Sequence, residues 1–226
     1  MGFSMACNIF TECTAEDVIS SLKLFYSKNK AQSRKVYDQV YGSDQPSEQV
    51  TVYDYGPSWV LVEFISEPID WIEFRQSEIS RELTCPGFMV FSDDGNYWGY
   101  QFFSSGKIVD TFSSDAYFHS EHSEILAPGD VDAVCRQLGS IDPADFATYL
   151  IQRPNNEIVG DDELIKFERS TNGKPRKGDR FDRWDEAACI NFLEFLGISY
   201  KEEKYGYLRP KKNPRFTIDN WGNETW

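Results

Sequence analysis

The sequence contains almost none of the short motifs that identify enzymes or nucleotide-binding proteins. Neither a GxGxxG nor a GxxxxGK[ST] pattern occurs, so the usual phosphate-binding loops are not predicted. No run of about eighteen apolar residues is present, and a membrane span is therefore not predicted. The first residues lack the basic and apolar regions of a signal peptide, so we expect no secretion signal.

Cysteines are few and are not arranged as a disulfide framework. Their number is odd, and no CxxC pair occurs among Cys7, Cys13, Cys85, Cys135 and Cys189. This pattern is typical of a reducing compartment, in which cysteines act as small core residues. We therefore expect a cytoplasmic protein with free thiols.

Basic residues are also scarce relative to acidic ones, and the formal net charge is -14. Residues 1–170 carry 12 Lys and Arg against 28 Asp and Glu, whereas residues 171–226 carry 11 against 9. An acidic surface attracts basic partners and repels nucleic acid, with the largest effect on association rates. One stretch of the chain is basic and contains Lys174, Arg176, Lys177, Arg180 and Arg183. Because Asp179 and Asp182 lie between these residues, the stretch does not predict nucleic-acid binding.

Hydrophobic residues are plentiful at 40% of the chain, which places it outside the composition of disordered proteins. The first periodic segment has apolar residues at helical spacing behind Thr14, a candidate N-cap, with Asp17 three positions later. Apolar and polar residues alternate at residues 50–55, and residues 59–65 form a β-branched run, so two strands are predicted around the turn formers Gly56 and Pro57. A short helix is predicted for residues 77–83.

The stretch FSDDGNYWGYQFFSSGKIVD predicts three strands in succession, at residues 88–91, 97–103 and 108–112. Asp94 and Gly95 are typical of a two-residue hairpin turn, since both tolerate positive φ. Asp93 and Asp94 could also suggest a calcium loop, but the alternating acidic ligands of such a loop are missing. We therefore predict a hairpin tip.

Helices dominate the rest of the chain. The pattern predicts a helix after Asp130 that ends at Gly139, and a second that begins with Asp142 as N-cap and Pro143 in its first turn. Two more are expected, in DDELIKFERS and WDEAACINFLEFLG, followed by an irregular segment at residues 201–216.

Together these elements predict an α+β fold: an antiparallel sheet of about five short strands, with an N-terminal helix and a helical C-terminal block. Residues 1–125 would hold the sheet and residues 126–226 the helical region, packed as one globular unit.

Histidines offer a second candidate metal site. His119 and His122 lie three residues apart with Glu121 and Glu124 beside them, so two imidazoles and a carboxylate could hold a metal. A third histidine is missing, and a polar loop would have the same composition. We therefore predict neither a metal nor a cofactor.

Three quoted segments carry a family resemblance: WVLVEFISEP, EISRELTCPGFMVFSDDGNYWGYQFFSSGKIVDTFSSDAYF and PGDVDAVCRQLG. They span residues 59–139 and resemble a family of uncharacterised bacterial α+β proteins. Some members are similar to the immunity proteins of polymorphic toxin systems. The resemblance implies a small acidic protein without catalysis, and it implies no catalytic residues.

We therefore expect a non-catalytic acidic binding protein of the bacterial cytoplasm, for which an immunity protein that neutralises a basic toxin is one form. Five acidic residues are candidate contacts to the partner: Asp93, Asp94, Asp115, Glu121 and Glu124. Two alternatives stay open, a metal-dependent enzyme that uses His119 and His122 with carboxylates, and a structural or scaffold protein. The sequence does not indicate an oligomeric state.

Overall fold

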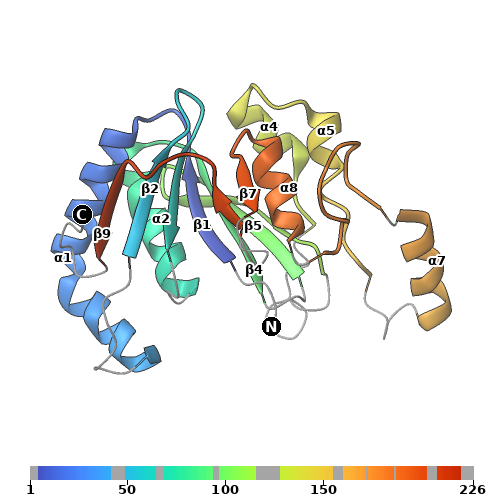
Figure 1. Ribbon diagram of the computed structural model, residues 1–226, viewed down its shortest axis with the longest axis horizontal. Helices are drawn as coiled ribbons and strands as arrows, with labels where there is room; N and C mark the ends of the chain where they lie inside the picture. The colour runs from blue at the N-terminus through green and yellow to red at the C-terminus, as the bar shows by residue number, and fades with distance from the viewer. Residues whose placement is uncertain are drawn as a thin grey trace. The chain divides into compact units, whose positions relative to one another are not determined.

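A computed structural model of the chain is shown in Figure 1. It describes residues 5–41, 49–64, 69–93, 97–115, 128–154, 160–171, 173–185, 187–202 and 208–219. The chain forms two compact units. Unit 1 comprises Met1–Met5, Val90–Phe102 and Val109–Leu196, and unit 2 comprises Ala6–Met89, Phe103–Ile108 and Gly197–Trp226.

Nine strands and six helices occur within the described ranges. In chain order they are β1 Met5–Phe10, α1 Ala15–Tyr41, β2 Gln49–Asp54, β3 Val60–Phe64, α2 Ile69–Leu83, β4 Gly87–Asp93, β5 Tyr97–Ser104, β6 Lys107–Ser113, α4 Val131–Leu138, α5 Pro143–Ala147, α7 Asp161–Thr171, α8 Ala188–Phe195, β7 Tyr200–Glu202, β8 Leu208–Pro210 and β9 Phe216–Asp219. No helix in these ranges is both long enough and apolar enough to cross a membrane.

The predicted α+β class with a large antiparallel sheet is confirmed, but the predicted number of about five strands is wrong. Seven strands form the main sheet in the order β6-β5-β4-β1-β3-β2-β9, and β7 pairs with β8 in a separate ribbon. The additional strands in the main sheet are β1 and β9, which lie before and after the segments whose alternating pattern predicted strands.

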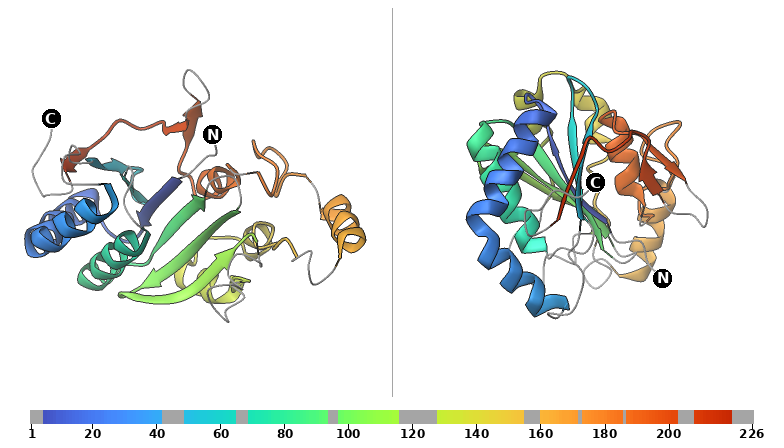
Figure 2. Two further views of the ribbon diagram at one scale, coloured as in Figure 1. Left: turned by 90° about the horizontal axis from the view of Figure 1, so that it is seen from below. Right: turned by 60° about the vertical axis from the view of Figure 1, so that its left-hand side comes forward.

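Unit 2 is built on the connectivity β1-α1-β2-β3-α2-β4 with the spatial order β4-β1-β3-β2. This is the split βαβ arrangement of ferredoxin-like folds. Both α1 and α2 lie against one face of the sheet (Figures 1 and 2). The register places Asn8 opposite Val62 and Val52 opposite Val62, so these buried side chains share that face.

The other face of the same strands is covered by β7. There the register aligns Cys7, Glu63 and Thr51 across β1, β3 and β2, and the hydroxyl of Tyr200 donates to Glu63 Oε1 at 3.0 Å. The sheet of unit 2 is therefore buried on both faces, which explains why β1 has no alternation of apolar and polar residues.

Two local predictions in unit 2 are corrected. The segment at residues 201–216, predicted to be irregular, forms part of β7, all of β8 and the start of β9, and β9 pairs with β2 through Val50 and Ile218. The predicted short helix at residues 77–83 is the end of α2, which begins at Ile69. Its first turns bury the polar side chains of Arg75 and Gln76, and these interrupt the apolar pattern that would have predicted the full helix.

In unit 1 the local capping predictions are confirmed. Gly139 ends α4 with a left-handed φ of 61°, as predicted. At the start of α4, Asp130 is an N-cap that was not predicted from the sequence, and its side chain accepts a hydrogen bond from Ala133 N. Asp142 caps α5, and Pro143 lies in its first turn. The predicted helices near residues 161 and 188 are also present as α7 and α8.

Candidate functional site

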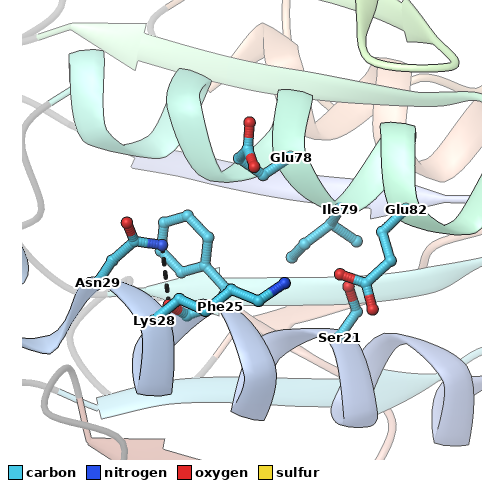
Figure 3. Close-up of a pocket in the computed structure, with 7 residues that line it drawn as sticks. All are labelled: Ser21, Phe25, Lys28, Asn29, Glu78, Ile79 and Glu82. Atoms are coloured by element: carbon cyan, nitrogen blue, oxygen red, sulfur yellow. Dashed lines mark hydrogen bonds between the residues drawn. The ribbon is translucent and has the colours of Figure 1, made fainter.

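A small hollow lies between α1 and α2 on the outer side of the helix layer of unit 2 (Figure 3). It has a cavity volume of about 20 Å³, which is enough for one water-sized group. We call it the α1/α2 hollow and define it by its lining residues: Ser21, Phe25, Lys28 and Asn29 from α1, and Glu78, Ile79 and Glu82 from α2.

The sequence explains why the two helices leave this space. Large rings hold them together nearby, since the Phe25 ring lies 5.4 Å from the Trp71 ring and 5.6 Å from the Phe74 ring. One turn before Phe25, α1 instead carries the small side chain of Ser21. Glu78 and Glu82 are four residues apart, so both carboxylates point to the same side of α2.

Ser21 is the most unusual residue of the hollow. It is 1% exposed, and within the described residues its hydroxyl has no hydrogen-bond partner. A buried hydroxyl without a partner costs free energy, so such groups normally form a hydrogen bond with another protein group or with a water molecule. In Figure 3 its side chain points toward the carboxylate of Glu82.

The charges around the hollow are unequal. Glu78 forms an ion pair with Arg81 on the same helix, at the surface. Glu82 is exposed and has no ion pair with any residue that the structure describes. Lys28 lies at the rim, yet no ion pair joins it to either carboxylate within the described residues. The hollow thus combines carboxylate and hydroxyl acceptors above the apolar side chains of Phe25 and Ile79.

A second group of polar residues surrounds Glu63 on the opposite face of unit 2. Burial raises the pKa of Glu63 to about 7, although hydrogen bonds from Tyr200 and Tyr53 and the charge of Arg209 act in the opposite direction. Burial also raises the pKa of Tyr55 to about 12, and its hydroxyl donates to the Ser199 carbonyl at 2.9 Å. Glu63 is therefore a carboxyl group that changes its charge near neutral pH.

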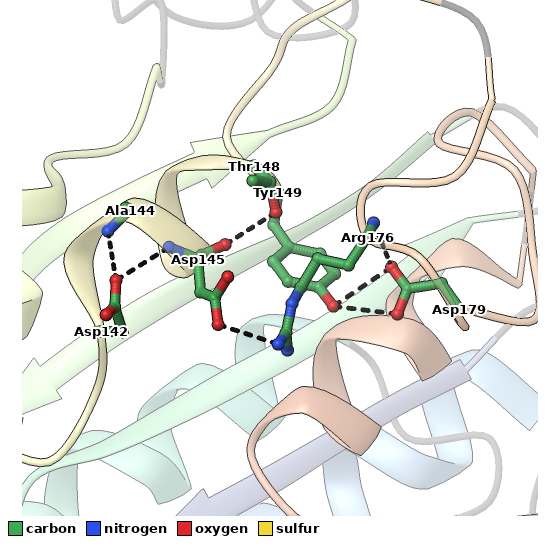
Figure 4. A network of polar contacts seen from close by, with 7 residues as sticks. All are labelled: Asp142, Ala144, Asp145, Thr148, Tyr149, Arg176 and Asp179. Atoms are coloured by element: carbon green, nitrogen blue, oxygen red, sulfur yellow. Dashed lines mark hydrogen bonds and ion pairs between the residues drawn. The ribbon is translucent and has the colours of Figure 1, made fainter.

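Unit 1 holds a network of polar contacts around α5 (Figure 4). Arg176 forms an ion pair with Asp145 at 2.8 Å, and its backbone N–H donates to Asp179 at 2.8 Å. The hydroxyl of Tyr149 lies 3.2 Å from each carboxylate oxygen of Asp179. The network therefore attaches the polar, basic segment after α7 to α5, with Asp142 as the cap of that helix.

Two further arginines of the basic stretch have partners inside unit 1. Arg183 donates to the Thr148 carbonyl and is buried. Arg180 lies 3.5 Å from a carboxylate oxygen of Glu194 and over the ring of Phe181. Like Arg176, both have contacts that stabilise the local fold.

The structure describes only part of the predicted partner-binding set. Asp115 forms a β-bridge with Arg153, and its carbonyl accepts a hydrogen bond from Ser113 Oγ at 2.9 Å. Asp93 ends β4, but its side chain is not described. The other predicted residues lie outside the described ranges, and their roles stay predictions: Asp94, Gly95, His119, Glu121, His122 and Glu124.

Sequence reasoning missed the residues of the α1/α2 hollow and Glu63. Ser21 did carry a signal, because it interrupts the apolar stripe of Val18, Leu22 and Phe25 on α1. Glu82 and Glu63 carried none, since carboxylates are frequent throughout this chain. No group of three or more His, Cys, Asp or Glu side chains that could hold a metal ion occurs in the described ranges.

Comparison with known proteins yields no relative for this chain: no family model matches it, and neither does any curated protein or any solved structure.

Proposed function

We propose that this chain is a non-catalytic binding protein for a basic partner, and that a lysine of the partner places its ammonium group in the α1/α2 hollow. The observation that carries the proposal is the buried hydroxyl of Ser21, which lacks a partner among the described residues beside the carboxylate of Glu82. The acidic composition of residues 1–170 supports the choice of a basic partner.

The chemistry of the hollow favours lysine over arginine. An ammonium group has three donors, and the hollow offers three acceptor side chains, Ser21, Glu78 and Glu82. Phe25 and Ile79 suit the apolar stem of a lysine side chain. The volume of about 20 Å³ is enough for one small polar group, and an ammonium group is such a group.

The proposal includes the role that the family resemblance implies. A bacterial immunity protein has to capture its toxin quickly, and a negative field raises the association rate with a basic protein. The candidate contacts Asp93, Asp94, Asp115, Glu121 and Glu124 would add to this field. Their part in binding rests on charge alone, whereas the hollow adds a specific contact.

The test uses a tetralysine peptide as the probe, titrated into the full chain at low ionic strength by calorimetry. Glu82→Gln should weaken tetralysine binding about tenfold, because a hydrogen bond to a charged group contributes about 1.5 kcal/mol or more. Lys28→Gln should strengthen binding, since it removes a competing cation from the rim. The matched control is Asp70→Asn, which removes the same charge from the first turn of α2, outside the hollow.

Several outcomes would contradict the proposal. Equal losses for Glu82→Gln and Asp70→Asn would show that only overall charge matters. A tetraarginine peptide that binds as tightly as tetralysine would exclude the hollow as a lysine site. If the rate of association with the basic partner does not fall at high salt, charge does not drive binding. Robust turnover of any substrate would contradict the proposal that the chain is non-catalytic.

A further inference from the structure

The β7–β8 ribbon is short and has few buried residues. Each of its strands has three residues, and the two strands pair in antiparallel fashion. Tyr200 and Pro210 lie opposite each other in this ribbon, and they are its buried residues. A two-stranded ribbon is at best marginally stable by itself, so the β7–β8 ribbon depends on its contacts with the rest of unit 2.

Tyr200 connects the ribbon to the carboxyl group of Glu63 on β3. Its hydroxyl donates to Glu63 Oε1 at 3.0 Å, and the Tyr200 side chain is 1% exposed. A second hydrogen bond attaches the residue before it, since the hydroxyl of Tyr55 donates to the Ser199 carbonyl at 2.9 Å. One of the two hydrogen bonds that hold this end of the ribbon therefore ends on a titratable acid.

The chain on each side of the ribbon allows it to move while the main sheet stays paired. Gly197 precedes the ribbon with a φ of 93°, in a conformation that glycine adopts without strain. Residues 212–214 follow the ribbon and are exposed. The next residue is fixed, because Arg215 N donates to the Val52 carbonyl at 2.7 Å directly before β9. A few residues at element ends are enough to absorb the rotations of a hinge.

The groups that face the Glu63 carboxyl group offer little to balance a negative charge. They come from β1, β2 and the turn after it, β7 and β8: Cys7, Tyr53, Tyr55, Tyr200 and Arg209. Thiol and phenol groups carry no positive charge. Arg209 does, but it is exposed, so water and salt weaken its effect. A carboxylate at this position would thus lose water without gaining a buried cation among the described residues that face it.

This environment makes the covered state sensitive to pH. Burial raises the pKa of Glu63 from 4.5 to about 7, against the opposing effect of the hydrogen bonds from Tyr200 and Tyr53. If the ribbon lifts, water returns to the carboxyl group and this burial is lost. The raised pKa therefore favours the covered state fully below about pH 4.5, and this advantage is lost as the pH rises to about 7.

We infer that the β7–β8 ribbon is a pH-sensitive cover, which lifts from the sheet when Glu63 loses its proton. The neutral carboxyl group accepts the hydrogen bond from Tyr200 beneath the ribbon, whereas the carboxylate requires water. The opening is local, since β9 remains paired with β2. It does not depend on the proposed lysine site, because α1 and α2 cover the other face of the sheet (Figure 2).

Hydrogen exchange of the full chain, followed by mass spectrometry at about pH 5 and about pH 8, tests the inference. Each exchange rate is divided by the rate of an unstructured peptide at the same pH, which gives a protection factor. We expect the protection factors of residues 199–202 and 208–211 to fall about 70-fold between the two pH values, as pKa values of 4.5 and about 7 require. These residues should also exchange faster than the middle of α1 at both pH values.

Two substitutions separate Glu63 from other acids. Glu63→Gln should abolish the fall in the protection factors of the ribbon, because glutamine stays neutral at both pH values. The matched control is Glu202→Gln, which removes an exposed carboxylate from the ribbon itself and should retain the fall.

Tyr200→Phe gives an independent readout and keeps the buried ring. The hydrogen bond from Tyr200 lowers the pKa of Glu63, so its removal should extend the fall in protection to a higher pH. A fall that ends at the same pH as in the wild type would contradict a contact between this hydroxyl and the carboxylate, and with it the inference.

The wild-type profile decides the inference even if a variant fails to fold. Protection factors of the ribbon that are equal at about pH 5 and about pH 8 would overturn it. Ribbon residues that exchange only as fast as the middle of α1 would show that the ribbon leaves only when unit 2 unfolds, which would also overturn it. The same fall in Glu63→Gln as in the wild type would exclude Glu63 as the group that controls the cover.

Discussion

Replacing Phe192 with alanine should lower the free energy of unfolding of unit 1 by about 3 to 5 kcal/mol, which is the range for truncating a buried phenylalanine. Phe192 lies on α8 and is fully buried. Its ring is 5.5 Å from the rings of both Trp98 and Tyr100, and the Tyr100 ring is stacked on it with an interplanar angle of 12°. Alanine would leave a cavity in the centre of this cluster.

Rings from α5 and the segment after it complete the cluster around Phe192. Phe146 lies 5.9 Å away and Tyr149 lies 5.8 Å away, so four aromatic rings lose a partner together. Rigid rings from several elements cannot move together to fill such a gap, so we expect a loss near the upper end of the range.

Urea denaturation followed by tryptophan fluorescence measures the effect. The control is Ile165→Ala on α7, because Ile165 is 43% exposed and its truncation should change the unfolding free energy little. A Phe192→Ala variant as stable as this control would show that the aromatic cluster does not hold unit 1 together.

Glu63→Gln should stabilise unit 2 at alkaline pH and have little effect at acidic pH. The pKa of Glu63 is raised from its ordinary value of 4.5 to about 7 because the carboxyl group is buried. The folded chain therefore keeps a proton that the unfolded chain has already released. The difference between the two values corresponds to about 3 kcal/mol.

The direction of the pH dependence follows from this proton. The neutral Glu63 contributes its full stability below the unfolded pKa, near 4.5, and this contribution is lost as the pH rises to about 7. Glutamine stays neutral at every pH and still offers an oxygen to the hydroxyl of Tyr200. The variant should therefore exceed the wild type by about 3 kcal/mol above neutral pH.

Urea denaturation of both proteins at about pH 5 and about pH 8 tests this expectation. Comparison at each pH cancels groups that titrate in both chains, such as Glu16, whose pKa is lowered mainly by the hydrogen bond from Arg215. The control Glu82→Gln removes an exposed carboxylate and should show no such difference. A pH-independent difference between wild type and Glu63→Gln would contradict the assignment of the raised pKa to Glu63.

Local rules determined several elements from the sequence alone. Gly139 predicted the end of α4 and the cap residue Asp142 predicted the start of α5, because capping depends on residues within a few positions of the backbone groups that they satisfy. Thr14 and Asp17 predicted the start of α1 for the same reason. The α+β class followed from periods of two and of about 3.6 residues.

Elements with non-local partners could not be predicted in this way. The short strand β9 has no strong alternation of its own, and it forms because Ile218 pairs with Val50 in β2. The strand β1 is buried on both faces and therefore lacks a polar side that would reveal its period. In both cases a distant neighbour supplies the reason for the strand.

The candidate sites were decided by tertiary structure. Ser21 and Glu82 line one hollow only because α1 packs against α2. In the sequence nothing distinguishes Glu63 from the rest of the 37 acidic residues. It becomes distinct only in the fold, where Tyr200 packs over it and donates a hydrogen bond to its carboxyl group. Sequence spacing determines which side chains share one helix or strand, whereas burial and pKa depend on which distant segments pack against them.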